Sequence, residues 1–305
     1  MPKIRRLVLE RVDGSEIDIS YLLNDVPKIL DIDCVGVEGL LPFLEKEGNN
    51  VSELSYQYEA IERLYQNKIS LETLKENPGL PLNKYVEEIL DEKVLCQSLQ
   101  KLDIFQASRP FKHLVIDGLW QPEVLAKVVE KFPEPSKMGG KHFNDERQNK
   151  FGTGVDVHSR VSPYISDFLL ALVGKNFRKW LSQITGLDNL IGDPLFKGSG
   201  LHQATQGGKL DIHVDFNRLT GHPNLKSVDR RLNVLIFLNK AWSDHFNGHL
   251  EFWKEGVIRP VCKNRPDFNR TVLFEAASKS FHGHPIPLSV LDSIIRKSIA
   301  SYYHQ

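Results

Sequence analysis

The sequence contains little cysteine and no long apolar run. Its 305 residues include only three cysteines, Cys34, Cys96 and Cys262, with no CxxC pair. This spacing excludes a disulfide framework or a cysteine zinc site, and we expect buried free thiols. No apolar stretch approaches the roughly 18 residues of a membrane span, and the first residues lack the apolar core of a signal peptide. We therefore expect a cytoplasmic protein without a membrane partner.

An excess of either charge is also lacking, because 39 Lys and Arg residues balance 39 Asp and Glu residues. A net charge of zero argues against a nucleic-acid partner. The balance conceals an asymmetry, since residues 1–104 contain 12 basic and 20 acidic residues and the remainder contains 27 and 19. The two parts can dock on each other through these opposite charges, or the basic part can attract anionic ligands.

Two domains are expected. Residues 1–104 open with a β-hairpin that turns at Asp13-Gly14 and continue as a mainly helical module of unassigned role. The second domain covers residues 105–305 and begins with a strand-like run and a helix that starts at Pro122. Two further helices each end on a glycine. Between the helix that starts at Pro122 and these two helices lies the polar, glycine-rich segment 136–154, for which we expect a mobile loop, with a lid over a site as one role.

From Asp193 onward the pattern changes to short runs with strand character, separated by turn residues. There are eight of them: LFKGSGLHQATQGG, KLDIHVDFN, RRLNVLIFLN, GHLEFW, VIRPVCK, RTVLFEA, SFHGHP and RKSIASYY. This spacing predicts two facing sheets in a sandwich or jelly roll. The expected fold class is α+β: a double-stranded β-helix (jelly-roll, cupin-like) core covered by helices, with the helical N-terminal module in addition.

One of these runs, KLDIHVDFN, has an unusual polar face. The period of two along a strand sends Asp211, His213 and Asp215 to one side and apolar residues to the other. His213 and Asp215 can then reach one metal ion, although a solvated or salt-bridged strand face is the simpler explanation of this motif when it stands alone.

A second histidine source lies about 70 residues downstream in SFHGHP. His282 together with His213 and Asp215 makes a set of two histidines and one carboxylate. Such a set leaves other coordination positions open and is typical of non-haem iron(II) sites that bind a cosubstrate and dioxygen. His284 shares the face of His282 and remains an alternative third ligand.

The last run, RKSIASYY, adds an anchor for an anion. Arg296 and Ser298 are two apart on a strand, so they offer a guanidinium group and a hydroxyl on one face. Their place shortly after the histidines favours an anchor for a dicarboxylate that also chelates the metal. The alternative is a surface arginine on an edge strand.

Taken together, these motifs resemble those of the 2-oxoglutarate- and Fe(II)-dependent oxygenases of the prolyl 4-hydroxylase-like superfamily, in its bacterial branch. The resemblance covers roughly residues 107–305 and rests on HxD, the distal HG and RxS in this order. It implies His213, Asp215 and His282 as iron ligands. It also implies Arg296 as the partner of the distal carboxylate of 2-oxoglutarate, assisted by Ser298, with the amide of Asn233 facing the cosubstrate.

The resemblance further implies Fe(II), 2-oxoglutarate and dioxygen as cofactors, with ascorbate as a candidate reductant. The implied reaction is hydroxylation of an unactivated C–H bond in an amino acid, a peptidyl residue or a small metabolite, with release of succinate and carbon dioxide. Desaturation, demethylation and ring formation are alternatives at the same site, and a non-catalytic jelly-roll binding module is an alternative of another class.

The motifs constrain the identity of the substrate less than that of the cofactors. Candidates for substrate contact are His202 and Gln203 before the HxD motif, Asn217 and Arg218 after it, and His284. The acidic N-terminal module suggests a larger substrate, such as a peptide or a carrier-bound molecule, although covering the barrel or forming a homodimer are equally good roles for it.

Overall fold

The computed structural model describes the strands at residues 8–10 and 16–18 and residues 90–305, except 139, 155, 156, 194 and 216–227. The expected N-terminal hairpin is confirmed, because β1 (Val8–Glu10) pairs antiparallel with β2 (Glu16–Asp18). The predicted helices of residues 19–89 lie outside the described residues. In the part of the chain that is described, no helix has both the length and the apolar character needed to cross a membrane.

A twelve-stranded antiparallel sheet dominates the described residues. Its central path follows the order β11-β10-β13-β8-β5-β7-β14-β9-β12-β3, with β4 added beside β5 and β6 beside β14. Strands β7 to β14 coincide with the eight predicted runs, which confirms them. The strands are β3 (His113–Asp117), β4 (Lys141–Asn144), β5 (Gln148–Gly152), β6 (Ile191–Gly192), β7 (Gly200–Ala204), β8 (Lys209–His213), β9 (Arg230–Phe237), β10 (Leu250–Trp253), β11 (Cys262–Asn264), β12 (Arg270–Glu275), β13 (Phe281–His284) and β14 (Arg296–His304).

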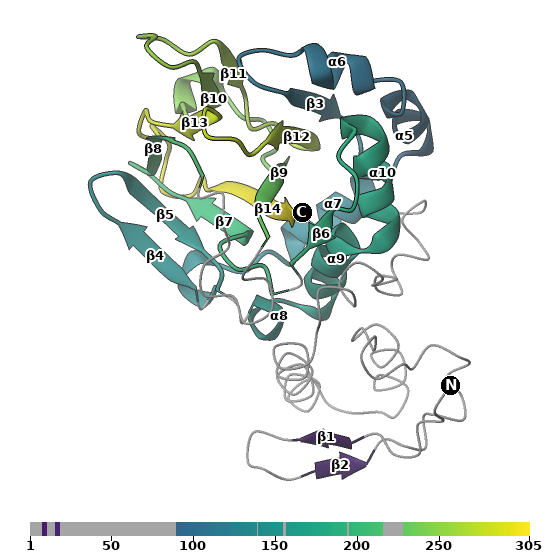
Figure 1. Cartoon of the computed structure of the whole chain (residues 1–305). Helices are drawn as coiled ribbons and strands as arrows, with labels where there is room; N and C mark the ends of the chain where they lie inside the picture. The colour runs from purple at the N-terminus through teal and green to yellow at the C-terminus, as the bar shows by residue number, and fades with distance from the viewer. Residues whose placement is uncertain are drawn as a thin grey trace.

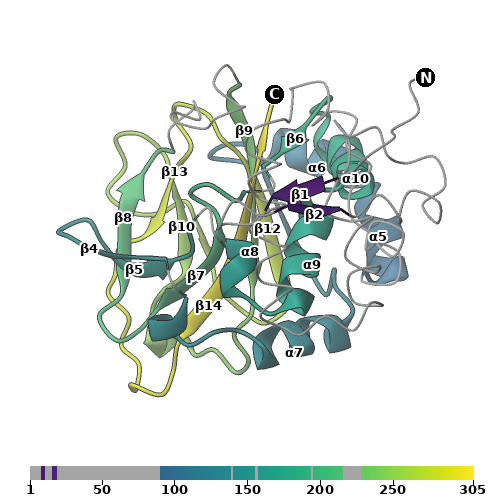
Figure 2. The same ribbon diagram turned by 90° about the horizontal axis from the view of Figure 1, so that it is seen from below.

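Helices gather on one side of this sheet, opposite the β4–β5 hairpin, in both views of the ribbon (Figures 1 and 2). The helix ends follow the sequence signals: Ser162 caps α9 by accepting a hydrogen bond from the amide of Ile165, and Gly186 ends α10 with φ of 73°. The helices are α5 (Glu92–Ser98), α6 (Leu102–Ala107), α7 (Pro122–Glu130), α8 (Val157–Arg160), α9 (Pro163–Val173) and α10 (Lys175–Thr185).

Strands β9 and β14 separate a helix-facing core from an internal cavity. Val234 and Ile236 of β9 join the core cluster that includes residues of α9 and α10, whereas Asn233 and Phe237 face the cavity. The alternation follows from the period of two along a strand. Each large apolar side chain that is fully buried in this core contributes about 1.5–3 kcal/mol to folding.

The sheet curls until its two ends face each other. The ring of Phe252 on β10 lies 5.3 Å from that of Phe274 on β12 and 4.7 Å from that of Phe111, although these strands are far apart in the sheet order. Aromatic contacts at this separation bury both rings and hold the two halves together. The core is therefore a jelly roll with an enclosed interior, as the strand pattern predicted.

The expectation of a mobile loop or lid at residues 136–154 is wrong. Residues 141–152 form the β4–β5 hairpin, in which the side chain of Asp145 accepts hydrogen bonds from the amides of Arg147 and Gln148. Strand β5 also pairs with β7 and β8, so it is an integral part of the barrel. The pattern was hidden because β4 is largely exposed and Phe151 is the only large apolar residue of β5, so neither strand alternates polar with apolar residues.

Two smaller expectations also need comment. The domain boundary expected at 104/105 falls inside α6, and α5 and α6 contact α10 through Trp180 and Thr185, so the domain division stays a prediction. Cys262 is a half-buried free thiol, but Cys96 is exposed, so the expectation of burial is wrong there. Helix α5 buries only Ser98, and Cys96 lies on its outer face. Cys34 lies outside the described residues.

Candidate metal centre

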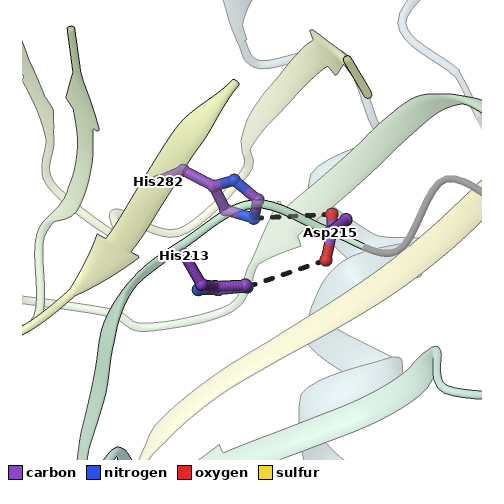
Figure 3. Close-up of side chains that lie close together, drawn as sticks. All are labelled: His213, Asp215 and His282. Carbon is purple, nitrogen blue, oxygen red and sulfur yellow. Dashed lines mark ion pairs between the residues drawn. The ribbon is translucent and has the colours of Figure 1, made fainter. Parts of the chain in front are cut away.

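Three predicted ligands meet at one end of the barrel (Figure 3). His213 ends β8 and lies directly opposite His282 of β13 in the strand register, and Asp215 follows two residues after His213. Their ligand atoms all lie within 4.8 Å of one another. Nε2 of His213 is 3.6 Å from Oδ1 of Asp215, and Nε2 of His282 is 3.5 Å from Oδ2. The expected constellation is thus assembled by strand pairing.

Both imidazole rings are oriented by the backbone. Nδ1 of His213 lies 2.9 Å from the carbonyl oxygen of Asp211, and Nδ1 of His282 lies 2.8 Å from that of Ser280. An Nδ1–H that donates to a carbonyl leaves Nε2 unprotonated and available to a metal. Gly283 lets the two strands approach, because a Cβ there would lie 2.7 Å from the carbonyl oxygens of Leu210 and Asp211.

Strand β9 holds the carboxylate of Asp215 from the other side. The amide of Asn233 donates to Oδ2 at 2.6 Å, and Nη1 of Arg230 lies 3.0 Å from Oδ1. Burial alone would raise the pKa of Asp215, but the interaction with His213 and the positive charge of Arg230 hold that pKa well below its usual range. The carboxylate is therefore ionised at neutral pH.

Burial keeps His282 neutral. It lowers the pKa of His282 to about 4, against the opposing attraction of Asp215. A neutral imidazole is the form that coordinates a metal, so this ligand needs no proton loss at physiological pH.

The three residues border a cavity of about 580 Å³ in the barrel interior. Arg296 lies in the same cavity with only 6% of its surface exposed, and its Nε donates to the carbonyl oxygen of Gly248 at 2.8 Å. Its guanidinium carbon is 5.1 Å from the centre of the Phe237 ring. No carboxylate of the described residues pairs with Arg296, and burial lowers its pKa to about 10, which still leaves it charged at pH 7. A buried, unpaired guanidinium suits an anionic ligand.

The other predicted contact residues are placed unequally. His202, Ser298 and His284 line the cavity, and Nδ1 of His284 is buried without a hydrogen-bond partner. Gln203 also borders the cavity, but its amide nitrogen donates to the carbonyl oxygen of Pro133 at 2.7 Å. Burial lowers the pKa of both His202 and His284 well below the usual value, and the charges of Lys150 and Arg296 add to this effect.

The remaining residues named from the sequence have different outcomes. Asn217 and Arg218 lie outside the described residues. Asp211 shares the strand face of His213, but its carboxylate is 3.1 Å from Nζ of Lys209 and is thereby neutralised. His284, the alternative third ligand, is not among the three residues whose ligand atoms come together.

Three basic residues of the cavity were not foreseen. Arg147, which is exposed, directly precedes β5, and Lys150 lies on β5, both in the segment expected to be a loop; Arg230 is the first residue of β9. Arg230 lies over the ring of Tyr302, with its guanidinium carbon 3.8 Å from the ring centre. Arg230 is an odd number of residues from Asn233 and Phe237, so a period of two would place it on the opposite strand face. The register between β9 and β14 shifts at this end of the strand, between Tyr303 and His304, and periodicity alone does not predict such a shift.

These residues fit a divalent metal ion with a chelating dicarboxylate. The donor set of two imidazoles and one carboxylate is the set that non-haem iron(II) prefers. It would leave the other coordination positions of a bound ion open. The orphaned Nδ1 of His284 and the unpaired Arg296 provide further polar groups for a bound ligand in the same cavity.

Comparisons with known proteins agree with this geometry. Residues 199–304 match the model of the 2OG-Fe(II) oxygenase superfamily, whose description names 2-oxoglutarate (2OG) and iron(II). Prolyl 3-hydroxylase OGFOD1 of Mus musculus is 25% identical over 201 residues, which cover 64% of this chain. The match spans 33% of that relative, so the chain corresponds to about one third of its length.

Solved structures with a similar fold have lower sequence identity. A prolyl hydroxylase of Trichoplax adhaerens, in complex with a hypoxia-inducible-factor peptide, is 17% identical with a TM-score of 0.48, covering 70% of this chain and 90% of that one. A prolyl-4-hydroxylase of Pseudomonas putida is 12% identical with a TM-score of 0.47, covering 69% and 98%.

Proposed function

Because residues 199–304 match the model of the 2OG-Fe(II) oxygenase superfamily, we propose that the chain is a 2-oxoglutarate- and iron(II)-dependent dioxygenase. Its reaction is hydroxylation of an unactivated C–H bond in an amino acid, a peptidyl residue or a small metabolite. The observation that carries the proposal is the meeting of His213, Asp215 and His282, with ligand atoms within 4.8 Å, in one cavity with the buried Arg296.

In this proposal His213, Asp215 and His282 hold the iron. The carbonyl oxygens of Asp211 and Ser280 fix the two imidazole rings, and Asn233 with Arg230 fixes the carboxylate. Bound iron(II), with 2-oxoglutarate and dioxygen, supplies the oxidising chemistry that inserts oxygen into the substrate and releases succinate and carbon dioxide. The protein supplies ligand geometry and a defined binding site.

Arg296 binds the distal carboxylate of 2-oxoglutarate, assisted by the hydroxyl of Ser298. The guanidinium is oriented before the cosubstrate binds, because Gly248 accepts a hydrogen bond from Nε and the ring of Phe237 lies beneath it. Such orientation reduces the entropy lost on binding. Asn233 was expected to face the cosubstrate. It lines the cavity, and its amide nitrogen is already bonded to Asp215.

The substrate occupies the remaining part of the cavity, where His202 and His284 are the proposed contacts. Apolar side chains on the same walls, including Leu235 and Phe274, limit the access of water. The similarity to a prolyl 3-hydroxylase supports an amino acid or a peptidyl residue as the substrate.

Succinate formation tests the proposal. The iron-loaded protein would be supplied with 2-oxoglutarate and a substrate library, and wild type would be compared with His213→Ala, Arg296→Ala and the control His245→Ala, which alters an exposed histidine outside the cavity. We expect His213→Ala to abolish turnover and Arg296→Ala mainly to raise the 2-oxoglutarate concentration required. Turnover that survives His213→Ala would remove the iron assignment.

The mass of the product distinguishes the reaction types. A gain of one oxygen atom supports hydroxylation, whereas a loss of two hydrogen atoms supports desaturation at the same site. Binding of metal and 2-oxoglutarate without any succinate formation, with or without substrate, would instead favour a non-catalytic binding module.

A further inference from the structure

Lys150 is a basic residue of the cavity wall that forms no ion pair with an acidic residue in the part of the chain that the structure describes. It is half-buried, and the centre of the Phe143 ring lies 5.6 Å from its Nζ. Burial lowers the pKa of Lys150 to about 8, and the positive charges of Arg296 and Arg230 contribute, against the attraction of Asp215. Placing an unpaired ammonium group in such a position costs stability unless an anion binds there.

Its position relative to Arg296 is set by strand pairing. Phe151 pairs with Gln203 and Gly152 with His202, and in that register Lys150 is level with Ala204, which pairs with Arg296 on β14. Lys150 and Arg296 therefore stand in one cross-strand row, two strand spacings or roughly 10 Å apart along the cavity wall. The two basic residues therefore enter the cavity from two different strands, β5 and β14, which lie on either side of β7.

The charges of the proposed occupants leave Lys150 uncompensated. Asp215 and one carboxylate of 2-oxoglutarate neutralise iron(II), and the other carboxylate neutralises Arg296. Arg230 then has only a share of Asp215, 3.0 Å away, and Lys150 has no counterpart among the described residues. A cavity that stays positive after metal and cosubstrate have bound favours a negatively charged substrate.

A second cleft of the molecule shows how surplus charge is otherwise handled. It has a volume of about 520 Å³ and also contains several basic residues. There Lys263 lies 3.0 Å from Glu251, and Arg265 lies 2.7 Å from Asp267. The basic residues of that cleft are paired within the protein, whereas Lys150 is not.

We infer that the substrate carries a carboxylate and that this carboxylate binds to the ammonium group of Lys150, with Arg230 contributing at its edge. The inference rests on the proposed function, because it assigns Arg296 to the cosubstrate and leaves Lys150 to the substrate. The carboxylate belongs either to a free amino acid or to an acidic side chain of a peptide, and both present the same group to the ammonium.

Calorimetry on protein loaded with Mn(II) and 2-oxoglutarate tests this inference. The probes are the free amino acids with their carboxamides, and N-acetylated Asp and Glu amides with their Asn and Gln counterparts. The variants are Lys150→Met and the matched control Lys141→Met, since Lys141 lies near the same Phe143 ring, 4.9 Å from its centre, but outside the cavity. The two probe sets separate a free amino acid from a peptide side chain.

We expect at least one acid to bind wild type about tenfold or more tightly than its amide. Lys150→Met should abolish this preference and Lys141→Met should keep it, while the affinity for 2-oxoglutarate stays the same in both. The inference is overturned if wild type shows no acid preference, if Lys150→Met retains it, or if Lys150→Met weakens 2-oxoglutarate as much as Arg296→Ala does. Tight binding of inorganic phosphate in place of every acid also overturns it.

Failure of the proposed function would be recognised separately. Wild-type protein that binds neither Mn(II) nor 2-oxoglutarate contradicts the oxygenase assignment, whatever Lys150 does. The same probes applied to the metal-free protein then decide whether Lys150 binds carboxylates.

Discussion

The side-chain amide of Asn233 donates a hydrogen bond of 2.6 Å to Oδ2 of Asp215, from strand β9, which carries none of the three proposed metal ligands. Arg230 on the same strand lies 3.0 Å from Oδ1. Both carboxylate oxygens are thus held from β9, while both imidazoles are held by backbone carbonyls. The orientation of all three ligands is fixed by the protein before any ion binds.

Replacing Asn233 should weaken metal binding. Asn233→Ala removes the shorter of the two contacts to Asp215, so we expect a loss of about 10–100-fold in Mn(II) affinity, measured by calorimetry. Asn264→Ala is the matched control, because Asn264 is also a buried asparagine but lies outside the cavity. Equal Mn(II) affinity in wild type and Asn233→Ala would show that Asp215 needs no orientation from β9.

Gly248 should be required for 2-oxoglutarate binding. It has φ of 72°, and a Cβ there would overlap Leu288 and come within 3.1 Å of Cδ of Arg296. Gly248→Ala should therefore displace the guanidinium and weaken 2-oxoglutarate about tenfold or more, as measured by titration of the Mn(II)-loaded protein.

Gly256→Ala separates this effect from backbone strain. Gly256 has a similar φ of 75°, but no atom lies within 4 Å of a Cβ built on it. We expect a loss of about 1–2 kcal/mol in the free energy of unfolding, without any change in 2-oxoglutarate affinity. If both variants bind 2-oxoglutarate equally well, the contact of Gly248 with Arg296 does not matter for the cosubstrate.

The metal-free protein should lose stability in mild acid. The pKa of His282 is about 4, and those of His202 and His284 are also well below the usual value, mainly because of burial. Imidazoles of the unfolded chain take up protons near pH 6.5, so the unfolded state binds more protons between about pH 6.5 and 4. The free energy of unfolding should fall as pH falls through this range, by up to ~1.4 kcal/mol per pH unit for each imidazole.

Denaturant titrations of the metal-free protein at pH 7, 6 and 5 measure this slope. His284→Gln should make the slope shallower, because it removes one of the three imidazoles whose pKa is lowered, whereas His245→Ala alters an exposed histidine and should leave the slope unchanged. A stability that does not vary over this range would mean that the three imidazoles are as easily protonated in the folded protein as in the unfolded chain.

Preference for acidic substrates should disappear at alkaline pH. Burial lowers the pKa of Lys150 to about 8, and the charges of Arg296 and Arg230 contribute to this lowering, against the opposing attraction of Asp215. Its charged form dominates at pH 7 and is lost as pH rises through 8, so the binding advantage of an acid over its amide should fall by up to tenfold per pH unit above that point. Calorimetry of one acid and its amide at pH 7, 8 and 9 measures this. An advantage that stays constant to pH 9 would contradict the role of Lys150.

The sequence predicted much of the barrel and most of the site, for a physical reason. Strands β9 and β14 each have one face against helices and one against the cavity, and the positions toward the helices are hydrophobic, such as Val234 and Ile236 on β9 and Ile299 and Tyr303 on β14. His213, Asp215, His282 and Arg296 stood out because polar groups on such strands are unusual. Their order along the chain then made the set specific.

The β4–β5 hairpin and its consequences could not be predicted in this way. Residues 148–152 contain Phe151 as their only large apolar side chain, so they show no alternation of polar and apolar residues. With β5 unrecognised, Lys150 had no assigned position. The contacts of Asn233 and Arg230 with Asp215 depend on how the sheet curls to bring β9 opposite the end of β8, which no local pattern records.

The curl of the sheet has a further consequence. At β5 its two halves are joined by hydrogen bonds to β7 and β8, but at the opposite seam hydrophobic side chains pack together, among them Phe111 with Phe252 and Phe252 with Phe274. Backbone pairing fixes a strand spacing, whereas packed side chains can be exchanged for larger or smaller ones. The bore of the barrel is therefore adjustable by substitutions along one seam, and homologues can acquire bulkier or slimmer substrates without altering any group that touches the metal.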